Sequence, residues 1–204
     1  MARGTHTDDI VLLRCCGDEI EPYLDAAARL RIEVFREYPY LYDGSAEYEA
    51  VYLQRYSACP ESLFVCALHA GEVVGVSTAL PLAAADEAFQ QPFRESGLIV
   101  DSYYYLGESC LLPQYRGRGI GHAFFDHREA HASSLGYETT TFCSVLRSPH
   151  HSKKPMDYRS HDRFWQNRGY HPSDLVAELA WKQVDAQGEE TNRLRFWQKT
   201  TMGC

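Results

Sequence analysis

A glycine- and arginine-rich segment, RGRGIG at residues 116–121, is the part of the sequence best suited to bind a charged ligand. Its glycines occupy every second position, and from Ile120 onward the apolar spacing is that of a helix. A glycine-rich turn that leads into a helix exposes backbone N–H groups, and the helix dipole favours negative charge in front of them. We therefore expect an anion site here, with a pyrophosphate as the natural guest and Arg116 and Arg118 adding positive charge.

Two other phosphate-binding loops fit this segment less well. A dinucleotide-binding turn needs the spacing G-x-G-x-x-G, whereas here Gly117, Gly119 and Gly121 alternate with other residues and His122 stands where the third glycine is needed. A Walker loop needs a closing Gly-Lys-Ser or Gly-Lys-Thr, which the segment lacks. An anion site at a helix N-terminus is therefore the preferred interpretation.

The segment resembles motif A of the GNAT superfamily of N-acetyltransferases, Q/R-x-x-G-x-G/A, in two overlapping registers that begin at Gln114 and Arg116. The preceding ESCLLPQY, the late RFWQNRGY, the early RLRIEVF and the hairpin HAGEVVG also resemble that family. The resemblance implies one GNAT-like domain over residues 1–204, acetyl-CoA as co-substrate, no metal, and acetyl transfer to a primary amine by direct attack in a ternary complex. It also implies a cofactor site formed by Leu111, Leu112, Gln114, Arg116, Gly117, Arg118, Gly119, Ile120, Gly121 and Trp165. In that site, backbone N–H groups near Leu111 and Leu112 would polarise the thioester carbonyl.

Acyl transfer to an amine needs a base for the amine and an acid for the departing thiolate. By its position before Pro113, Glu108 matches the glutamate with which many family members remove the amine proton, and we expect partial burial to raise the pKa of Glu108. The family's acid is commonly a tyrosine at the position that Trp165 occupies here, and an indole N–H does not supply a proton at neutral pH. Tyr158 and His161 are the alternative acids, and both remain open.

The resemblance places the acceptor site at the aromatic loop EYPYLYDG and at the long loop before the last helix. Aromatic faces attract cations and a carboxylate orients them, so this loop suits a small cationic amine. Strict alternation along the strand puts Tyr104 on the face of Glu108, and therefore in the same pocket. The predicted acceptor-binding residues are Tyr38, Tyr40, Tyr42, Asp43 and Tyr104.

Two other functions stay open beside this one: a non-catalytic acyl-CoA-binding sensor, and an acetyltransferase of protein lysines or N-termini. A metal site has little support. His127 and His131 lie one helical turn apart, but HREAH lacks the glutamate of the HExxH motif, so we expect two packed, hydrogen-bonded histidines. The pair His150 and His151, followed by lysines, is expected in a solvated loop.

Composition restricts the possible partners and surroundings. The 204 residues are 45% hydrophobic and carry a net charge of -8, which allows a sizeable core and argues against a nucleic-acid partner or a polybasic membrane surface. The seven cysteines lack paired spacing, as is typical of reduced thiols, and no stretch is long and apolar enough to span a membrane. We therefore expect a soluble, cytoplasmic monomer or homodimer.

The elements that must position these residues follow from hydrophobic periodicity. The pattern predicts helices at 18–39, 45–57, 120–135 and 161–167, and strands at 10–15, 62–69, 72–80, 100–112, 137–146, 176–184 and 193–198. This order predicts an α/β fold in which helices flank a mixed, mostly antiparallel central sheet in a single GNAT-like domain. The strand at 100–112 runs directly into the anion turn.

Overall fold

One seven-stranded sheet organises the molecule in the computed structural model, which describes residues 10–201. The strands are β1 (Val11–Cys15), β2 (Leu63–His69), β3 (Glu72–Pro81), β4 (Tyr103–Leu111), β5 (Thr139–Val145), β6 (His171–Lys182) and β7 (Glu189–Thr200). They lie in the order β1-β2-β3-β4-β5-β7-β6, and every neighbouring pair is antiparallel except β4 and β5. The predicted fold class, a mixed and mostly antiparallel sheet flanked by helices, is confirmed.

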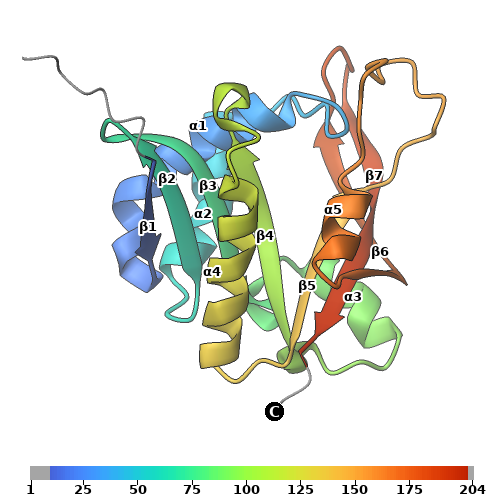
Figure 1. Cartoon of the computed structure of the whole chain (residues 1–204). Helices are drawn as coiled ribbons and strands as arrows, with labels where there is room; N and C mark the ends of the chain where they lie inside the picture. The colour runs from blue at the N-terminus through green and yellow to red at the C-terminus, as the bar shows by residue number, and fades with distance from the viewer. Residues whose placement is uncertain (1–9, 202–204) are drawn as a thin grey trace, which may run out of the picture.

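Helices cover both faces of the sheet (Figure 1). They are α1 (Leu24–Phe35), α2 (Ala46–Ser57), α3 (Glu87–Glu95), α4 (Ile120–Ser134) and α5 (Asp162–Asn167). Helices α4 and α5 lie in front of the sheet in this view, and α1, α2 and α3 lie behind it. No helix within residues 10–201 is long and apolar enough to cross a membrane.

Local sequence signals account for several helix boundaries. The hydroxyl of Ser45 accepts a hydrogen bond from the Tyr48 N–H at 3.3 Å and caps α2, at the start of the helix predicted at 45–57. The predicted helix at 18–39 instead begins as a 3-10 turn over Gly17–Tyr23, which contains Pro22, and becomes α-helical only at Leu24. The Asp86 side chain caps α3, since its carboxylate accepts a hydrogen bond from the Ala88 N–H at 3.1 Å.

A β-bulge in β4 determines which side chains share a face. Ser109 lies opposite Ser77, whereas Leu106 lies opposite Ala79, so β4 has one more residue than β3 in this interval. The extra residue places Glu108 behind the sheet on the side of Tyr105. Tyr104 and Leu106 pack in front, with α4. The expectation that Tyr104 and Glu108 share a face is therefore wrong, because strict alternation does not hold across a bulge.

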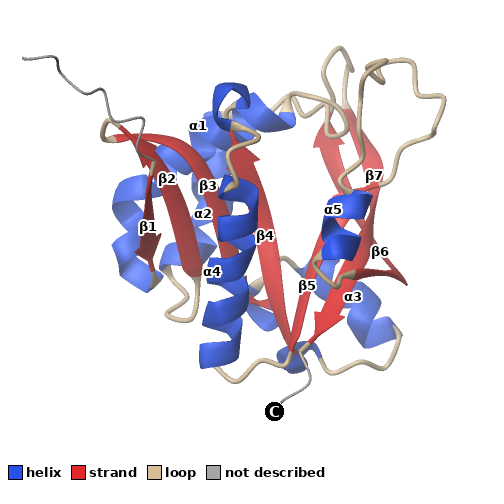
Figure 2. Cartoon of the chain, in the orientation of Figure 1, coloured by secondary structure: helices blue, strands red, loops and turns tan. Residues whose placement is uncertain are grey.

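Strands β4 and β5 are paired over a short stretch only. Tyr103–Tyr105 lies beside Thr139–Thr141, and the pairing stops there. Figure 2 shows the two strands separating above this stretch, toward the end of β4 where α4 begins. The later part of β4 therefore has one edge that is not bonded to β5.

Candidate active site

The glycine-rich turn lies at the N-terminus of α4. Gly117 and Gly119 adopt left-handed φ angles of 77° and 82°, and Gly119 occupies the cap position without a side-chain hydrogen bond. A Cβ added at either glycine would meet no heavy atom within 4 Å, so the space in front of the turn is open. The sequence therefore places no side chain where a ligand would approach the backbone.

The backbone donors of this turn are unused. Within residues 10–201, no backbone or side-chain group accepts a hydrogen bond from the N–H groups of residues 117–121. Helical bonding starts just afterwards, since the N–H groups of His122 and Ala123 donate to the Gly119 carbonyl at 3.0 and 3.2 Å. A row of free donors at the positive end of a helix can bind an anion.

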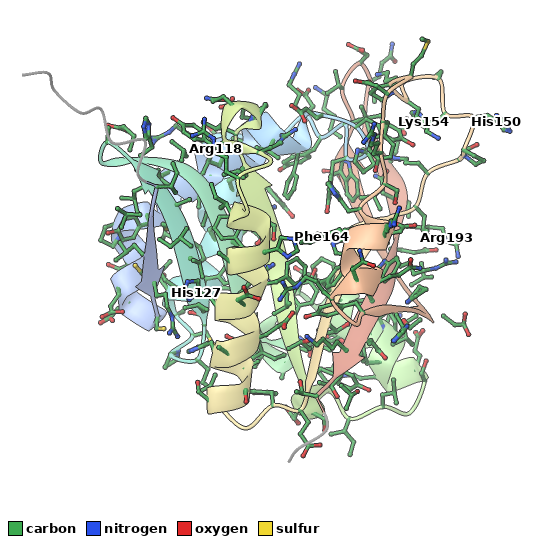
Figure 3. All side chains as sticks on the ribbon, viewed as in Figure 1. Arg118, His127, His150, Lys154, Phe164 and Arg193 are labelled. Carbon is green, nitrogen blue, oxygen red and sulfur yellow. The ribbon has the colours of Figure 1, made fainter. Side chains whose placement is uncertain are left out.

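The two arginines of the turn have different surroundings. Arg116 pairs with Glu37 at 3.0 Å and donates from Nε to the Leu111 carbonyl at 3.1 Å. Arg118 donates to the Gln114 carbonyl at 3.3 Å and forms no salt bridge with any described residue. Figure 3 shows Arg118 at the end of α4 that carries the turn. Arg118 is thus the cation whose charge remains available to an anion.

Only one of the two expected backbone donors at the end of β4 is free. The Leu112 N–H donates to the Val74 carbonyl at 3.1 Å, so it is already used in the pairing with β3. Successive N–H groups alternate in direction along a strand, which directs the Leu111 N–H to the open edge of β4. The expected role of Leu112 as a donor is therefore wrong for its N–H group, and Leu111 keeps the role as a prediction.

The late motif packs on the front of the sheet. The Phe164 ring lies 4.8 Å from the His122 ring and 5.6 Å from the Phe125 ring, centroid to centroid. Phe164 extends from α5 in Figure 3, and these contacts link α5 to α4. The Trp165 ring lies 5.1 Å from that of Trp197, over β7. Trp165 is half-buried over β5 and β7, since its ring also lies 5.1 Å from that of Phe142, and cofactor contact stays a prediction.

The two candidate acids precede this motif in the chain. The Tyr158 ring meets the Tyr38 ring edge-on at 4.6 Å, and partial burial raises the pKa of Tyr158. Desolvation and the nearby Arg116 lower the pKa of His161, whose ring is 5.8 Å from that of Trp165. The raised pKa makes the Tyr158 phenol a weaker acid, and the lowered pKa leaves a smaller fraction of His161 protonated at neutral pH. The choice between them remains a prediction.

Glu108 is the centre of a buried polar network on the back of β4. Only 7% of it is exposed, and its carboxylate accepts hydrogen bonds from the Tyr52 hydroxyl at 2.7 Å and the Tyr56 hydroxyl at 3.0 Å. It also forms an ion pair with Arg31 and accepts a hydrogen bond from the Thr78 hydroxyl. Each carboxylate oxygen therefore has at least two partners.

This network overturns the expected acidity of Glu108. Burial by itself would raise the pKa of Glu108, but Arg31 and the hydroxyls of Thr78, Tyr52 and Tyr56 hold it below its ordinary value. The expected rise is wrong because the sequence did not show these partners. An ionised carboxylate with all of its oxygens occupied is a weak acceptor for a further proton.

Arg128, which the sequence pattern did not single out, holds the bulge from the front. This arginine is 1% exposed, and its Nη1 donates to the carbonyls of Thr78 and Glu108 at 3.3 and 3.2 Å. Its Nη2 donates to the Ser109 hydroxyl at 2.9 Å, and burial lowers the pKa of Arg128 to about 10. An arginine among the apolar positions of the helix at 120–135 was the available signal.

A cavity of about 90 Å³ lies beside Glu108 behind the sheet. It joins Tyr40 and Tyr42 of the predicted acceptor loop to Glu108. Helices α2 and α3 and strands β4 and β6 contribute further aromatic residues that the sequence pattern did not predict for this site. The lining residues are Arg31, Phe35, Tyr40, Tyr42, Tyr48, Tyr52, Phe89, Tyr105, Gly107, Glu108, Cys143, Leu179, Ala180, Trp181 and Leu194.

The other predicted acceptor residues lie elsewhere. Tyr38 packs against Tyr158, as described above. Asp43 binds Lys182 at 2.8 Å and Arg36 at 2.9 Å, and these hydrogen bonds lower the pKa of Asp43. Tyr104 is fully buried in front of the sheet and donates to the Glu61 carbonyl at 2.8 Å.

The histidines behave as packing and surface groups. The His131 ring is buried, with Nε2 3.2 Å from the Glu61 carbonyl, while His127 lies one turn earlier on α4 (Figure 3). His150 is exposed in the loop that precedes α5, where Figure 3 also shows Lys154. Within residues 10–201, no three His, Cys, Asp or Glu side chains are grouped so that they could hold a metal ion.

The arrangement of sheet, turn and cavity can be compared with known proteins. The model of the acetyltransferase (GNAT) family matches residues 27–154. A search of curated proteins finds no match.

Solved structures share the fold at low sequence identity. A ribosomal-protein-alanine N-acetyltransferase from Brucella melitensis is 13% identical, with a TM-score of 0.58 over 93% of this chain and 99% of the other. An N-acetyltransferase from Staphylococcus aureus is 13% identical, with a TM-score of 0.57 over 93% and 98%. A Salmonella typhimurium protein, named as an acetyltransferase and solved with its cofactor acetyl-CoA, is 10% identical, with a TM-score of 0.58 over 96% of both chains.

Proposed function

Because the chain belongs to the acetyltransferase (GNAT) family, we propose that it transfers the acetyl group of acetyl-CoA to the primary amine of a small molecule. The single observation that carries this proposal is the row of unused backbone N–H groups at residues 117–121, in front of α4. A diphosphate carries the negative charge and the acceptor oxygens to which these N–H groups could donate. We further propose that the whole chain works as one domain.

The residues present fit acetyl-CoA. Gly117, Gly119 and Gly121 would donate to the diphosphate, with Arg118 beside them, and the Leu111 N–H would donate to the thioester carbonyl oxygen. Acetyl-CoA, when bound, supplies the activated acetyl carbon. A donor directed at that oxygen stabilises the negative charge that develops there as the amine attacks.

The cavity on the back of β4 is the proposed acceptor site. Its aromatic lining and volume of about 90 Å³ suit a small amine rather than a folded protein surface. During transfer, a bond forms between the amine nitrogen and the acetyl carbon while the carbon–sulfur bond breaks. The amine loses a proton to water, and the thiolate takes up a proton from water or from one of the two candidate acids.

Glu108 takes a positioning role in this proposal. Both oxygens of its carboxylate already bind partners, so Glu108 does not itself accept the amine proton. The partners are Arg31, Thr78, Tyr52 and Tyr56. It fixes the back of the bulge and the floor of the cavity instead. The arrangement of Arg31 and the three hydroxyl groups around Glu108 depends on the carboxylate of Glu108 staying negatively charged at neutral pH.

Two measurements test the proposed function. Release of the CoA thiol is followed for a panel of small primary amines and, in parallel, for peptides with free N-termini or lysines. Release that depends on a small amine supports the proposal. Tight acetyl-CoA binding without release would favour the acyl-CoA sensor, and release with peptides alone would favour a protein acetyltransferase.

The cofactor site has a matched pair of variants. Gly119→Glu places a carboxylate in front of the turn, and Gly71→Glu introduces the same residue at another left-handed glycine, φ 85°, where an added Cβ also meets nothing. Both changes strain the backbone by about 1–2 kcal/mol. Calorimetric titration should show that Gly119→Glu abolishes acetyl-CoA binding and that Gly71→Glu does not. Equal affinities in the two variants would contradict the assignment of the site.

A further inference from the structure

The charged groups that reach the cavity are paired with each other. Within residues 10–201, the only charged residues of its lining are Arg31 and Glu108, which form an ion pair. Glu49, the second carboxylate that contacts Arg31, is 0% exposed and lies outside the lining. Asp43, the carboxylate expected to orient a cation, instead binds two cationic side chains outside the cavity. A ligand in this cavity therefore meets a paired cation and anion rather than a free charge.

Two of the aromatic rings in the lining already face a cation. The rings of Phe35 and Tyr52 lie 5.1 and 4.3 Å from the Arg31 guanidinium, measured from ring centroid to Cζ. The Tyr52 ring also faces Arg55, at 4.7 Å. An ammonium group placed against these rings would be repelled by the arginines. This side of the cavity therefore favours an uncharged part of a ligand.

Aromatic rings form much of the remaining wall. The Phe35 ring stacks on that of Tyr40 with centroids 4.2 Å apart, and the Phe89 ring stacks on that of Tyr105 at 4.9 Å. The Trp181 ring lies 6.2 Å from that of Tyr40. A further ring among them gains stacked or edge-to-face contacts in addition to the burial of its apolar area. The lining therefore favours a ligand that carries an aromatic ring.

The cavity lies behind the place where β4 and β5 separate. The pairing of these strands ends at Tyr105 and Thr141, and the lining continues with Gly107 on β4 and Cys143 on β5. Figure 2 shows the separation of the two strands. Tyr48 lines the cavity and is 53% exposed, so the cavity is reached from solvent beside this ring. A ligand that enters here lies next to the open edge of β4.

These surroundings also suit the nitrogen that reacts. Attack on a thioester needs the neutral amine, and transfer from water into a buried site without a free charge disfavours the ammonium form. The cavity of about 90 Å³ holds on the order of six to nine waters, which corresponds to a ligand with a similar number of non-hydrogen atoms. A benzene ring, a chain of two carbons and an amine nitrogen make up about nine such atoms.

We propose that the acceptor is an arylalkylamine, in which a chain of about one or two carbons joins a single aromatic ring to the primary amine. The ring lies among Tyr40, Tyr48 and Trp181, and the nitrogen faces Gly107 at the open edge of β4. On entry, the ammonium form gives one proton to solvent. The nitrogen then forms a bond to the acetyl carbon while the carbon–sulfur bond breaks. The nitrogen loses a second proton to water, and the thiolate takes up a proton from water or from one of the two candidate acids.

This inference rests on the proposed function for its reaction, and on the cavity alone for its ring site. A binding experiment tests the ring site without turnover, because acetyl-CoA is left out. 2-Phenylethylamine is titrated calorimetrically into the full chain and into Tyr48→Ala, Tyr48→Phe and Val51→Ala. Val51 is the control, since it is 72% exposed on the same helix and lies outside the lining.

Loss of the Tyr48 ring should weaken binding of 2-phenylethylamine about threefold or more. The affinities of Tyr48→Phe, which keeps the ring, and of Val51→Ala should equal that of the parent chain. No binding to the parent chain, or equal affinities in the two alanine variants, overturns the inference.

A turnover experiment separates this inference from the proposed function. The kcat/KM for acetylation of 2-phenylethylamine is compared with the values for two other amines. 2-Cyclohexylethylamine has as many non-hydrogen atoms but no aromatic ring, and 1,4-diaminobutane carries a second ammonium group. We expect 2-phenylethylamine to exceed the cyclohexyl compound about threefold or more, because of the ring contacts. It should exceed the diamine about tenfold or more, because burial of the second charge is unfavourable.

The outcomes distinguish the two claims. If the cyclohexyl compound or the diamine is acetylated as well as 2-phenylethylamine, the arylalkylamine inference is overturned and the acetyltransferase is left intact. Absence of CoA release with every amine, with binding of 2-phenylethylamine retained, overturns the proposed function and the acceptor role, and leaves a site for an aromatic ring.

Discussion

Replacement of Glu108 by glutamine tests the buried network from which the candidate site is built. The change keeps the shape of the side chain and removes its charge, so Arg31 loses one of its two carboxylate partners. Breaking a buried ion pair by removing one partner costs about 3–5 kcal/mol. Glutamine still offers one acceptor oxygen to the Tyr52, Tyr56 and Thr78 hydroxyls, so we expect the loss to lie within that range rather than above it.

Urea unfolding of Glu108→Gln and of the parent chain measures this loss. With a slope of about 2–3 kcal/mol per M, the midpoint of Glu108→Gln should fall by about 1–2 M. The lowered pKa of Glu108 in the folded state means that its stabilisation is complete above the ordinary glutamate pKa of about 4.3 and is lost as the pH falls through the lowered value. The difference between the two proteins should therefore be constant from pH 8 to pH 5 and shrink below about pH 4.

An exposed acid provides the control for this prediction. Glu138 lies on the surface, and Glu138→Gln should leave the midpoint within about 0.5 kcal/mol of the parent value. A Glu108→Gln protein as stable as Glu138→Gln would refute the buried network. A stability difference that grows as the pH falls below 5 would show that Glu108 has a raised pKa, as a general base would.

Two further predictions concern α4. Arg128→Lys removes the guanidinium that donates to two carbonyls and to the Ser109 hydroxyl. Urea unfolding should show a loss of about 2–3 kcal/mol in the free energy of unfolding. The control Arg29→Lys, at an exposed position on α1, should change it by no more than about 0.5 kcal/mol. Burial lowers the pKa of His131, so the folded protein resists its protonation and stability should fall as the pH drops below the ordinary histidine value of about 6.5. His131→Gln should flatten the stability profile between pH 7 and pH 5, and an unchanged slope would contradict this assignment.

The glycine-rich turn and the order of the elements could be predicted because their signals are local. Alternating glycines followed by an apolar helical pattern identify the turn and α4, and hydrophobic periodicity identifies the strands that form the sheet. Strand β6 begins at His171, earlier than the predicted 176, because its first residues pair with β7 across a register shift that the sequence pattern does not show.

The floor of the candidate site could not be predicted because contacts between distant residues create it. The bulge in β4 depends on Arg128 in front of the strand and on the Glu108 network behind it. The bulge puts Glu108 on the opposite face of the sheet from Tyr104. The partners that surround Glu108 on that face lower its pKa, whereas the sequence predicted a raised pKa. The aromatic cavity likewise collects rings from helices and strands that are far apart in the sequence.

The most direct test of the account is the position of the diphosphate in a structure of the protein with acetyl-CoA. We predict that its oxygens lie within about 3 Å of the backbone nitrogens of Gly117, Gly119 and Gly121, with the acetyl group at the Leu111 end of β4. A diphosphate bound elsewhere, with these N–H groups left facing solvent, would contradict the account.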